Sequence, residues 1–150
     1  MTAAALRPAR LLTWTGLVLT VAVAALPFVA PVLLADQVRA GYPDYTATQV
    51  QEAVLTWQSV LALIAGLGAL GWVWTLWSLR RPRRWAPFSA TALLAVALVL
   101  AVALLSTPDT SGQVGLAPAV GWAWLVPCMA GVAVTIASWR SRTAARADLA

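Results

Sequence analysis

Four long uncharged apolar stretches decide what this chain can fold into. They cover residues 11–34, 54–79, 85–105 and 120–139. An α-helix needs about 20 mostly apolar residues to cross roughly 30 Å of bilayer hydrocarbon. Only 10% of the residues are charged and 61% are hydrophobic, whereas a soluble domain has about 25% charged and about 45–50% apolar residues. The sequence therefore predicts a single all-α domain with four transmembrane helices.

Three connections join these four stretches, at residues 35–53, 80–84 and 106–119. Short connections favour antiparallel neighbouring helices, so we expect an up-down-up-down four-helix bundle. In the first connection, Thr46 with Gln49, or Thr48 with Gln51, can form a capping box. We therefore expect the second helix to begin before the membrane, near residue 47, as a short amphipathic lead-in.

The charged residues divide between the two sides of the predicted bundle. One side carries nine of the ten arginines, namely Arg7, Arg10, Arg80, Arg81, Arg83, Arg84, Arg140, Arg142 and Arg146. The other side carries Arg39 and four of the five acids, namely Asp36, Asp44, Glu52 and Asp109. Short arginine-rich loops stay in the cytoplasm. Both termini are therefore predicted to be cytoplasmic, with residues 35–53 and 106–119 outside.

The basic residues are all arginine, which is typical of GC-rich coding sequences and indicates a high-GC bacterium and its inner membrane. Juxtamembrane arginines attract anionic headgroups, so we expect lipid contacts at Arg80, Arg81, Arg83, Arg84, Arg140 and Arg142. Nucleic-acid binding is not expected, because no soluble module presents these groups. A membrane-protein partner is compatible with the sequence, and the oligomeric state is left open.

Aromatic side chains mark the two predicted interfaces, because indole and phenol rings favour the headgroup level. The inner belt consists of Trp14, Trp77, Trp85 and Trp139, and the outer belt of Tyr42, Tyr45, Trp57, Trp122 and Trp124. Trp72 and Trp74 fall deeper and are predicted to pack between helices.

Prolines and small residues predict the local geometry of the helices. Pro27 and Pro31 stand one turn apart, so we expect a kink or an early helix end there, and Pro127 predicts a kink in the fourth span. Small residues four positions apart allow close helix contacts. Such pairs are Ala62 with Gly66, Ala65 with Ala69, Ala97 with Ala101, and Ala133 with Ala137. Threonine and serine hydroxyls in the spans are expected to bond backbone carbonyls of their own helix.

Several chemistries are excluded by missing residue types. The chain has no histidine and one cysteine, which excludes histidine-ligated haem or zinc and any internal disulfide. Cys128 is interpreted as a small buried hydrophobic residue. The four spans contain no Asp, Glu, Lys or Arg, which argues against proton- or ion-coupled transport. We therefore expect no catalytic residue, no metal ligand and no cofactor.

The chain resembles the small uncharacterised four-span membrane proteins of high-GC bacteria, through its architecture, the Asp109-Thr110-Ser111-Gly112 segment and the neighbouring Gly121-Trp122. This resemblance implies no activity. The favoured hypothesis is a non-enzymatic accessory or assembly partner of a membrane complex. The alternative is an oligomeric pore or carrier for an uncharged or apolar solute. A third hypothesis is a lipid-headgroup enzyme that uses Asp36, Asp44, Glu52 and Asp109, if these carboxylates converge in space.

Overall fold

The computed structural model describes residues 3–80, 85–108 and 115–147, with side chains placed for 8–80, 85–108 and 115–143. Every regular element in these ranges is a helix: α1 (Ala3–Val29), α2 (Val32–Gly41), α3 (Ala47–Arg80), α4 (Ala86–Ser106), α5 (Pro118–Ala123) and α6 (Leu125–Ala147). Four segments are long and apolar enough to cross a membrane, namely Pro8–Val29, α3, α4 and Pro118–Thr143. The predicted all-α, multi-pass membrane architecture is confirmed.

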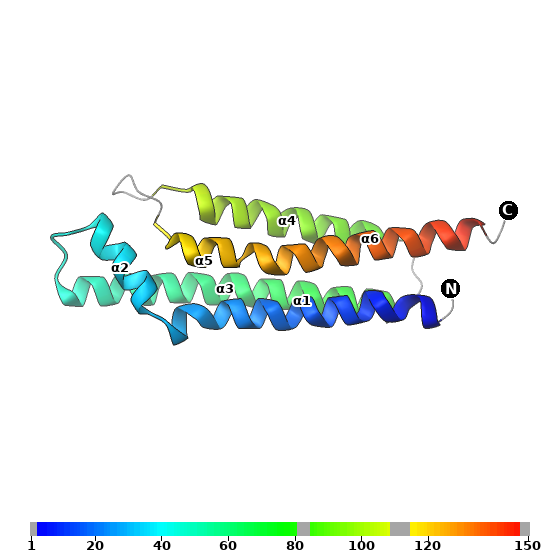
Figure 1. Ribbon diagram of the computed structural model, residues 1–150, viewed down its shortest axis with the longest axis horizontal. Helices are drawn as coiled ribbons and strands as arrows, with labels where there is room; N and C mark the ends of the chain where they lie inside the picture. Colours follow the sequence, from blue (N-terminus) through cyan, green and yellow to red (C-terminus); the bar gives the residue numbers. More distant parts are fainter. Residues whose placement is uncertain (1–2, 81–84, 109–114, 148–150) are drawn as a thin grey trace.

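The long helices pack unequally around the bundle. α1 packs against both α3 and α6, and α4 packs mainly against α6, with a much smaller contact to α3. Figure 1 shows both chain termini at one end of the bundle, which we call the termini end. α2, the end of α4 and the start of α5 lie at the opposite end, which we call the α2 end (Figure 1). The side between α3 and α4 is therefore the least closed side of the bundle.

The first apolar stretch, predicted as one span over residues 11–34, is two helices. α1 keeps Pro27 inside it but ends at Val29, and α2 starts at Val32. Pro31 has no N–H, so it cannot bond the carbonyl of Pro27 four residues earlier. The Gln58 side chain of α3 supplies the missing donor, with Nε2 lying 2.8 Å from the Pro27 carbonyl oxygen. The helix therefore ends at a proline break that a neighbouring helix satisfies.

The connection 35–53 is more helical than the sequence predicted. α2 occupies its first part because Leu34 and Val38, four positions apart, are both buried on one face. Its other face is polar, with Arg39 Nη1 3.3 Å from Asp36 Oδ1 in an exposed i,i+3 pair. The sequence analysis assigned no helix to this part of the connection, and the structure places ten residues of α2 there with Leu34 and Val38 buried.

α3 begins at Ala47, as predicted, and the first of the two candidate capping boxes is the one that forms. Thr46 N donates to Gln49 Oε1 at 2.9 Å, and Gln49 N donates to Thr46 Oγ1 at 3.4 Å. α3 has 34 residues, which at about 1.5 Å per residue is far longer than a roughly 30 Å hydrocarbon layer requires. Its first turns pack with α2 at the α2 end of the bundle.

The fourth span is also divided. α5 ends at Ala123, Trp124 forms a turn, and α6 starts at Leu125, two residues before Pro127. The Trp124 amide bonds the Gly121 carbonyl, three residues back, at 3.2 Å. A proline in the first turn of a helix is tolerated because its position needs no N–H donor. The sequence analysis located the irregularity near Pro127 correctly, but it predicted a kink within one helix, whereas the structure has two separate helices.

Three residues predicted to pack between helices, Ala62, Gly66 and Trp74, are exposed instead. Ala62 is exposed, and a Cβ added at Gly66 would meet nothing within 4 Å outside its own helix turn. This pair does not mediate a helix contact in the structure, because α3 turns that face away from α1 and α4. Trp74, predicted to pack between helices, is 48% exposed and lies against Trp77 and Trp85, with ring centroids 5.2 and 5.9 Å away.

A cluster of buried apolar side chains lies at the α2 end. It is a cluster of buried side chains drawn from α1, α2, α3 and the α5 region, consisting of Val23, Leu34, Val54, Leu61, Leu116, Ala117, Val120 and Trp124. Leu61 and Leu34 are 0% and 1% exposed. This cluster closes the bundle at that end, and the less closed side between α3 and α4 begins next to it.

Candidate functional site

A cavity of about 370 Å³ occupies the weakly packed side of the bundle. Its walls come from residues between 64 and 75 of α3, 90 and 104 of α4, and 127 and 135 of α6, together with Thr20 of α1 and Trp124 in the turn before α6. Small-molecule sites are commonly clefts of about 300–1,000 Å³. No Asp, Glu, Lys or Arg is among the lining residues. The cavity therefore offers an apolar site at the depth of the membrane-spanning helices.

Small residues keep this cavity open. Gly68 and Gly71 on α3, Ala97 and Ala101 on α4, and Gly131 on α6 all line it. A Cβ at Gly131 would approach Leu94 Cδ1 to 3.0 Å, and a Cβ at Gly71 would lie 3.6 Å from Leu93 Cδ2. Larger side chains at these positions would enter the space between the helices. The predicted close-contact pair Ala97 and Ala101 thus lies on the cavity wall.

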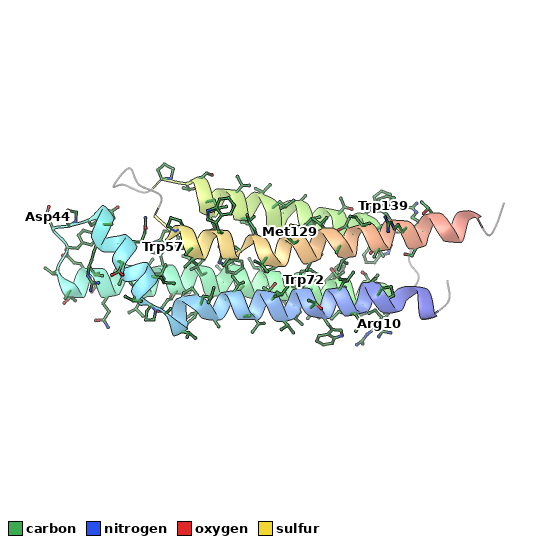
Figure 2. All side chains as sticks on the ribbon, viewed as in Figure 1. Arg10, Asp44, Trp57, Trp72, Met129 and Trp139 are labelled. Carbon is green, nitrogen blue, oxygen red and sulfur yellow. The ribbon has the colours of Figure 1, made fainter. Side chains whose placement is uncertain are left out.

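Trp72 forms the wall between the cavity and α1. A Cβ at Gly16 would overlap the Trp72 ring, so the indole fits only because α1 has a glycine there. Trp72 Nε1 donates to Thr20 Oγ1 at 2.8 Å, and that hydroxyl donates to the Gly16 carbonyl oxygen at 2.9 Å. Figure 2 shows Trp72 near the middle of the bundle. The prediction that Trp72 packs between helices is confirmed.

Trp124 was expected at an exposed outer interface, and this expectation was wrong. Its side chain is 7% exposed and belongs to the buried cluster at the α2 end. Trp124 also lines the cavity, and its Nε1 atom is buried without a hydrogen-bond partner among the described residues. Cys128, buried as predicted, lies one turn further and places its Sγ 3.5 Å from the Trp124 carbonyl oxygen. The break before α6 therefore carries an unpaired indole donor.

Thr135 is the exception among the buried hydroxyls of the spans. As predicted, Thr13, Thr20, Thr75, Thr91 and Ser138 donate to the carbonyl four residues earlier, at 2.7–2.9 Å. Thr135 Oγ1 is buried but makes no such bond within the described part of the chain. Thr135 also lines the cavity. Two of the cavity residues therefore carry a buried polar atom with no hydrogen-bond partner among the described residues.

The predicted outer acids do not assemble into a site in the described residues. Asp36 pairs with Arg39, and Figure 2 shows Asp44 at the tip of the α2 end. Glu52 is an exposed residue of α3. Asp109 and the Asp109–Gly112 segment lie outside the described residues. Within the described ranges, no three His, Cys, Asp or Glu side chains are grouped as metal ligands.

The predicted lipid-contacting arginines lie toward the termini end. Arg80 is the last residue of α3, and Arg140 and Arg142 belong to α6. The Arg142 guanidinium carbon lies 4.9 Å from the Phe88 ring centroid and 5.4 Å from that of Trp139. Its Nη1 atom is buried and makes no hydrogen bond with the described residues. The remaining three, Arg81, Arg83 and Arg84, lie outside the described residues.

No protein-family model, curated protein or solved structure matches the chain. Sequence reasoning did not identify the cavity, nor the unpaired atoms of Trp124 and Thr135. The sequence signal nearest to these atoms is Pro127, three residues after Trp124, because a proline indicates a break in an otherwise apolar helix.

Proposed function

We propose that this is a non-enzymatic accessory protein of the bacterial inner membrane that binds an uncharged, apolar molecule in the cavity between α3 and α4. The observation that carries this proposal is the cavity itself, whose lining contains no Asp, Glu, Lys or Arg. An ionised ligand would lose its hydration there without gaining a countercharge. A lipid-soluble molecule reaches the same place from the bilayer at no such cost.

The proposed orientation puts the termini end in the cytoplasm and the α2 end outside. It is supported by the arginine asymmetry of the sequence and by the two termini lying at one end (Figure 1). Figure 2 shows Arg10 and Trp139 toward that end and Asp44 at the opposite one. An up-down-up-down bundle follows from this placement. Arg142, resting on Phe88 and Trp139, is then held at the inner headgroup level, where anionic lipid can satisfy it.

Filling the cavity from one wall tests the binding proposal. In Gly71→Leu the new side chain enters the space facing Leu93, so we expect the protein to lose the apolar molecule with which it copurifies. Gly66→Leu is the matched control on the same helix, because a Cβ at Gly66 meets nothing within 4 Å. Native mass spectrometry of both variants, purified from native membranes in a mild detergent, measures the bound molecule directly.

A second cavity-filling variant keeps the test valid if Gly71→Leu does not fold. Ala97→Phe fills the same cavity from α4 and should also remove the ligand. Retention of the molecule by both Gly71→Leu and Ala97→Phe, at the level of Gly66→Leu, contradicts a ligand in this cavity. Thermal unfolding in the same detergent shows that the variants compared are folded.

The accessory role predicts that a second membrane protein is bound to this one, and recovery of that partner tests it. Gentle crosslinking in native membranes followed by purification should recover a second membrane protein in a fixed ratio. A chain that is recovered alone under these conditions contradicts the accessory role and leaves the binding cavity unaffected.

Transport of an uncharged solute is the second candidate, because the same cavity could serve as a carrier site. It predicts flux of an uncharged, apolar solute into proteoliposomes that Gly71→Leu abolishes and Gly66→Leu preserves. Binding without any protein-dependent flux favours the accessory role over transport.

A further inference from the structure

The cavity between α3 and α4 extends across the middle of the membrane-spanning region. Its α4 lining runs from Ala90 to Leu104, which is about 21 Å at about 1.5 Å per residue. α4 itself has 21 residues and just spans a roughly 30 Å hydrocarbon layer. Val96 is the middle residue of α4 and lines the cavity. The cavity therefore reaches into both leaflets and is centred near the bilayer midplane.

The mouth of the cavity lies at this midplane. Leu67 of α3 and Val96 of α4 both line the cavity, yet their side chains are 57% and 58% exposed. A Cβ at Gly71 would lie 3.6 Å from Leu93 Cδ2, so these two residues are level. One turn from each toward the α2 end, Leu67 lies opposite the turn of α4 that contains Val96. The two exposed side chains therefore flank an opening that faces the lipid, and Leu100, also exposed, extends it by one turn.

Both ends of the cavity are closed by buried side chains. Toward the termini end, the lining residues Thr75 and Ala90 are buried. Toward the α2 end, Trp124 is buried and Leu104 packs against the buried cluster there. Charged headgroups are costly to bring into the membrane interior, so a phospholipid keeps its headgroup at the surface and meets the mouth only with the end of an acyl chain. The midplane mouth therefore favours a molecule that has no headgroup.

The polar side chains described in the lining offer such a molecule no hydrogen bond that it must satisfy. The hydroxyls of Thr20 and Thr75 donate to carbonyls of their own helices, at 2.9 and 2.8 Å, and Trp72 Nε1 donates to Thr20 Oγ1. Trp124 Nε1 and Thr135 Oγ1 are enclosed by protein atoms, so a ligand in the cavity does not reach them. A ligand with polar groups would lose their hydration here without replacement. Selection is therefore by shape.

The dimensions of the cavity fit one extended hydrocarbon chain. About 370 Å³ over about 21 Å of length gives a mean cross-section of about 18 Å². Carbon atoms in contact are about 4 Å apart, so one chain has a cross-section of about 13 Å² and two chains need about 25 Å². A transmembrane helix, about 10 Å in diameter, needs about 80 Å². At about 1.2 Å per bond of an extended chain, about 21 Å corresponds to roughly 18 carbons.

We infer that the cavity binds one linear hydrocarbon chain without a headgroup, which enters sideways from the bilayer midplane between Leu67 and Val96. The bound chain lies along α4 with a part in each leaflet and with both of its ends enclosed. Chains much longer than roughly 18 carbons do not fit, because the cavity is closed at both ends. This inference rests on the proposed function, and it names the ligand class and the route of entry for the same cavity.

Photolabelling of the full-length protein in phosphatidylcholine liposomes tests this inference. The probe is hexadecane with a diazirine at the middle of the chain, which loses N₂ on irradiation and inserts into a neighbouring C–H bond. The readout is label on Leu94 and Ala97, two half-buried residues of the lining. We expect excess octadecane to reduce this label to background and the longer tetracosane to leave it unchanged. Phosphatidylcholine with a diazirine in its acyl chain should not label these two residues.

Variants at the mouth test the route of entry. Val96→Trp obstructs the mouth and should reduce label in the lining to background. Val99→Trp is the matched control, because Val99 is exposed on the same helix but does not line the cavity. On α3, Leu67→Trp and its control Leu63→Trp repeat the comparison. All four side chains are exposed, so the substitutions leave the buried cluster intact. Label that both mouth variants retain at the level of their controls contradicts entry at the midplane.

The remaining outcomes separate this inference from the proposed function. Label from the phosphatidylcholine probe on Leu94 and Ala97 overturns the chain without a headgroup and keeps an apolar ligand. Equal competition by octadecane and tetracosane overturns the closed ends. No label in the lining from the hexadecane probe, with a copurifying molecule still lost in Gly71→Leu, overturns the hydrocarbon chain and keeps the proposed function. No label from either probe, with no molecule lost in Gly71→Leu, contradicts both.

Discussion

Trp72 shows how one large side chain organises the inside of this bundle. Its ring occupies the space that a side chain at residue 16 would need, and its N–H is bonded to Thr20. That hydroxyl in turn bonds its own helix. The three groups join α1 to α3 at the cavity wall, where lipid provides no hydrophobic force to hold helices together.

Removing the acceptor of this contact should destabilise the protein measurably. Thr20→Val leaves the Trp72 N–H buried without a partner, and we expect the free energy of unfolding to fall by about 0.6–1.7 kcal/mol, the range for interhelical hydrogen bonds in membranes. Steric trapping in bicelles measures this change. Thr15→Val is the control, because the Thr15 hydroxyl bonds only its own helix, at 3.1 Å from the Leu11 carbonyl oxygen.

The double variant Trp72→Phe with Thr20→Val measures the interaction energy between these two side chains. Once Trp72 is changed to Phe, the further change Thr20→Val should have little effect, because no indole donor remains to be left unpaired. Additive losses in the double variant would show that the two side chains act independently.

Sequence patterns could identify Trp72 but not Trp124, for a physical reason. Trp72 lies in the middle of a long span, where an indole has no interface to reach and packs between helices. Trp124 lies near the end of a span, where an indole usually faces the headgroups. These helices are apolar nearly all round, so periodicity does not indicate which face is buried. Only the packing of α1, α2, α3 and the α5 region shows that Trp124 is enclosed.

The break between α1 and α2 is the clearest example of a helix end that a neighbouring helix stabilises. Pro31 deprives the Pro27 carbonyl of its helical donor, and Gln58 of α3 provides the replacement at 2.8 Å. The proline pair made the helix end predictable. α2 was not predictable, because ten residues with two buried apolar positions resemble a polar loop until α3 lies beside them.

Gln58→Leu should therefore weaken this join. The Pro27 carbonyl would be left without a donor, and we expect the free energy of unfolding to fall by about 1–3 kcal/mol, the cost of an unsatisfied buried polar group. Thermal unfolding in detergent gives the direction, and steric trapping gives the size.

Gln51→Leu is the matched control for this prediction. Gln51 is exposed on the same helix, so its replacement removes an amide without affecting the proline break. Equal stability of Gln51→Leu and Gln58→Leu would mean that the Gln58 hydrogen bond contributes nothing to the join.

At the scale of the whole molecule, the length of the uncharged stretches was enough to predict four membrane-crossing segments. The cavity was not predictable, because it results from unequal contacts among four similar helices. α4 packs on α6 more than on α3, and no single stretch of sequence encodes that difference. The lining glycines and alanines look the same in sequence as Gly66, which faces outward.

The placement of the charges leads to a prediction about topology. Reporters fused after residues 44 and 110 should show extracytoplasmic alkaline phosphatase activity, and fusions after 82 and 150 should not. A fluorescent protein that matures only in the cytoplasm is the complementary reporter at the same four positions. Phosphatase activity after residue 82 would contradict the proposed orientation.

The contact between α1 and α6 also has a consequence for biosynthesis. α1 leaves the ribosome well before α6, yet the two share a large interface. Until α6 is inserted, the face of α1 that it covers has only lipid or the insertion machinery beside it. Membrane insertion and assembly are therefore separate events in this chain. The early α1–α3 pair must remain in the membrane, incomplete, until α6 is inserted.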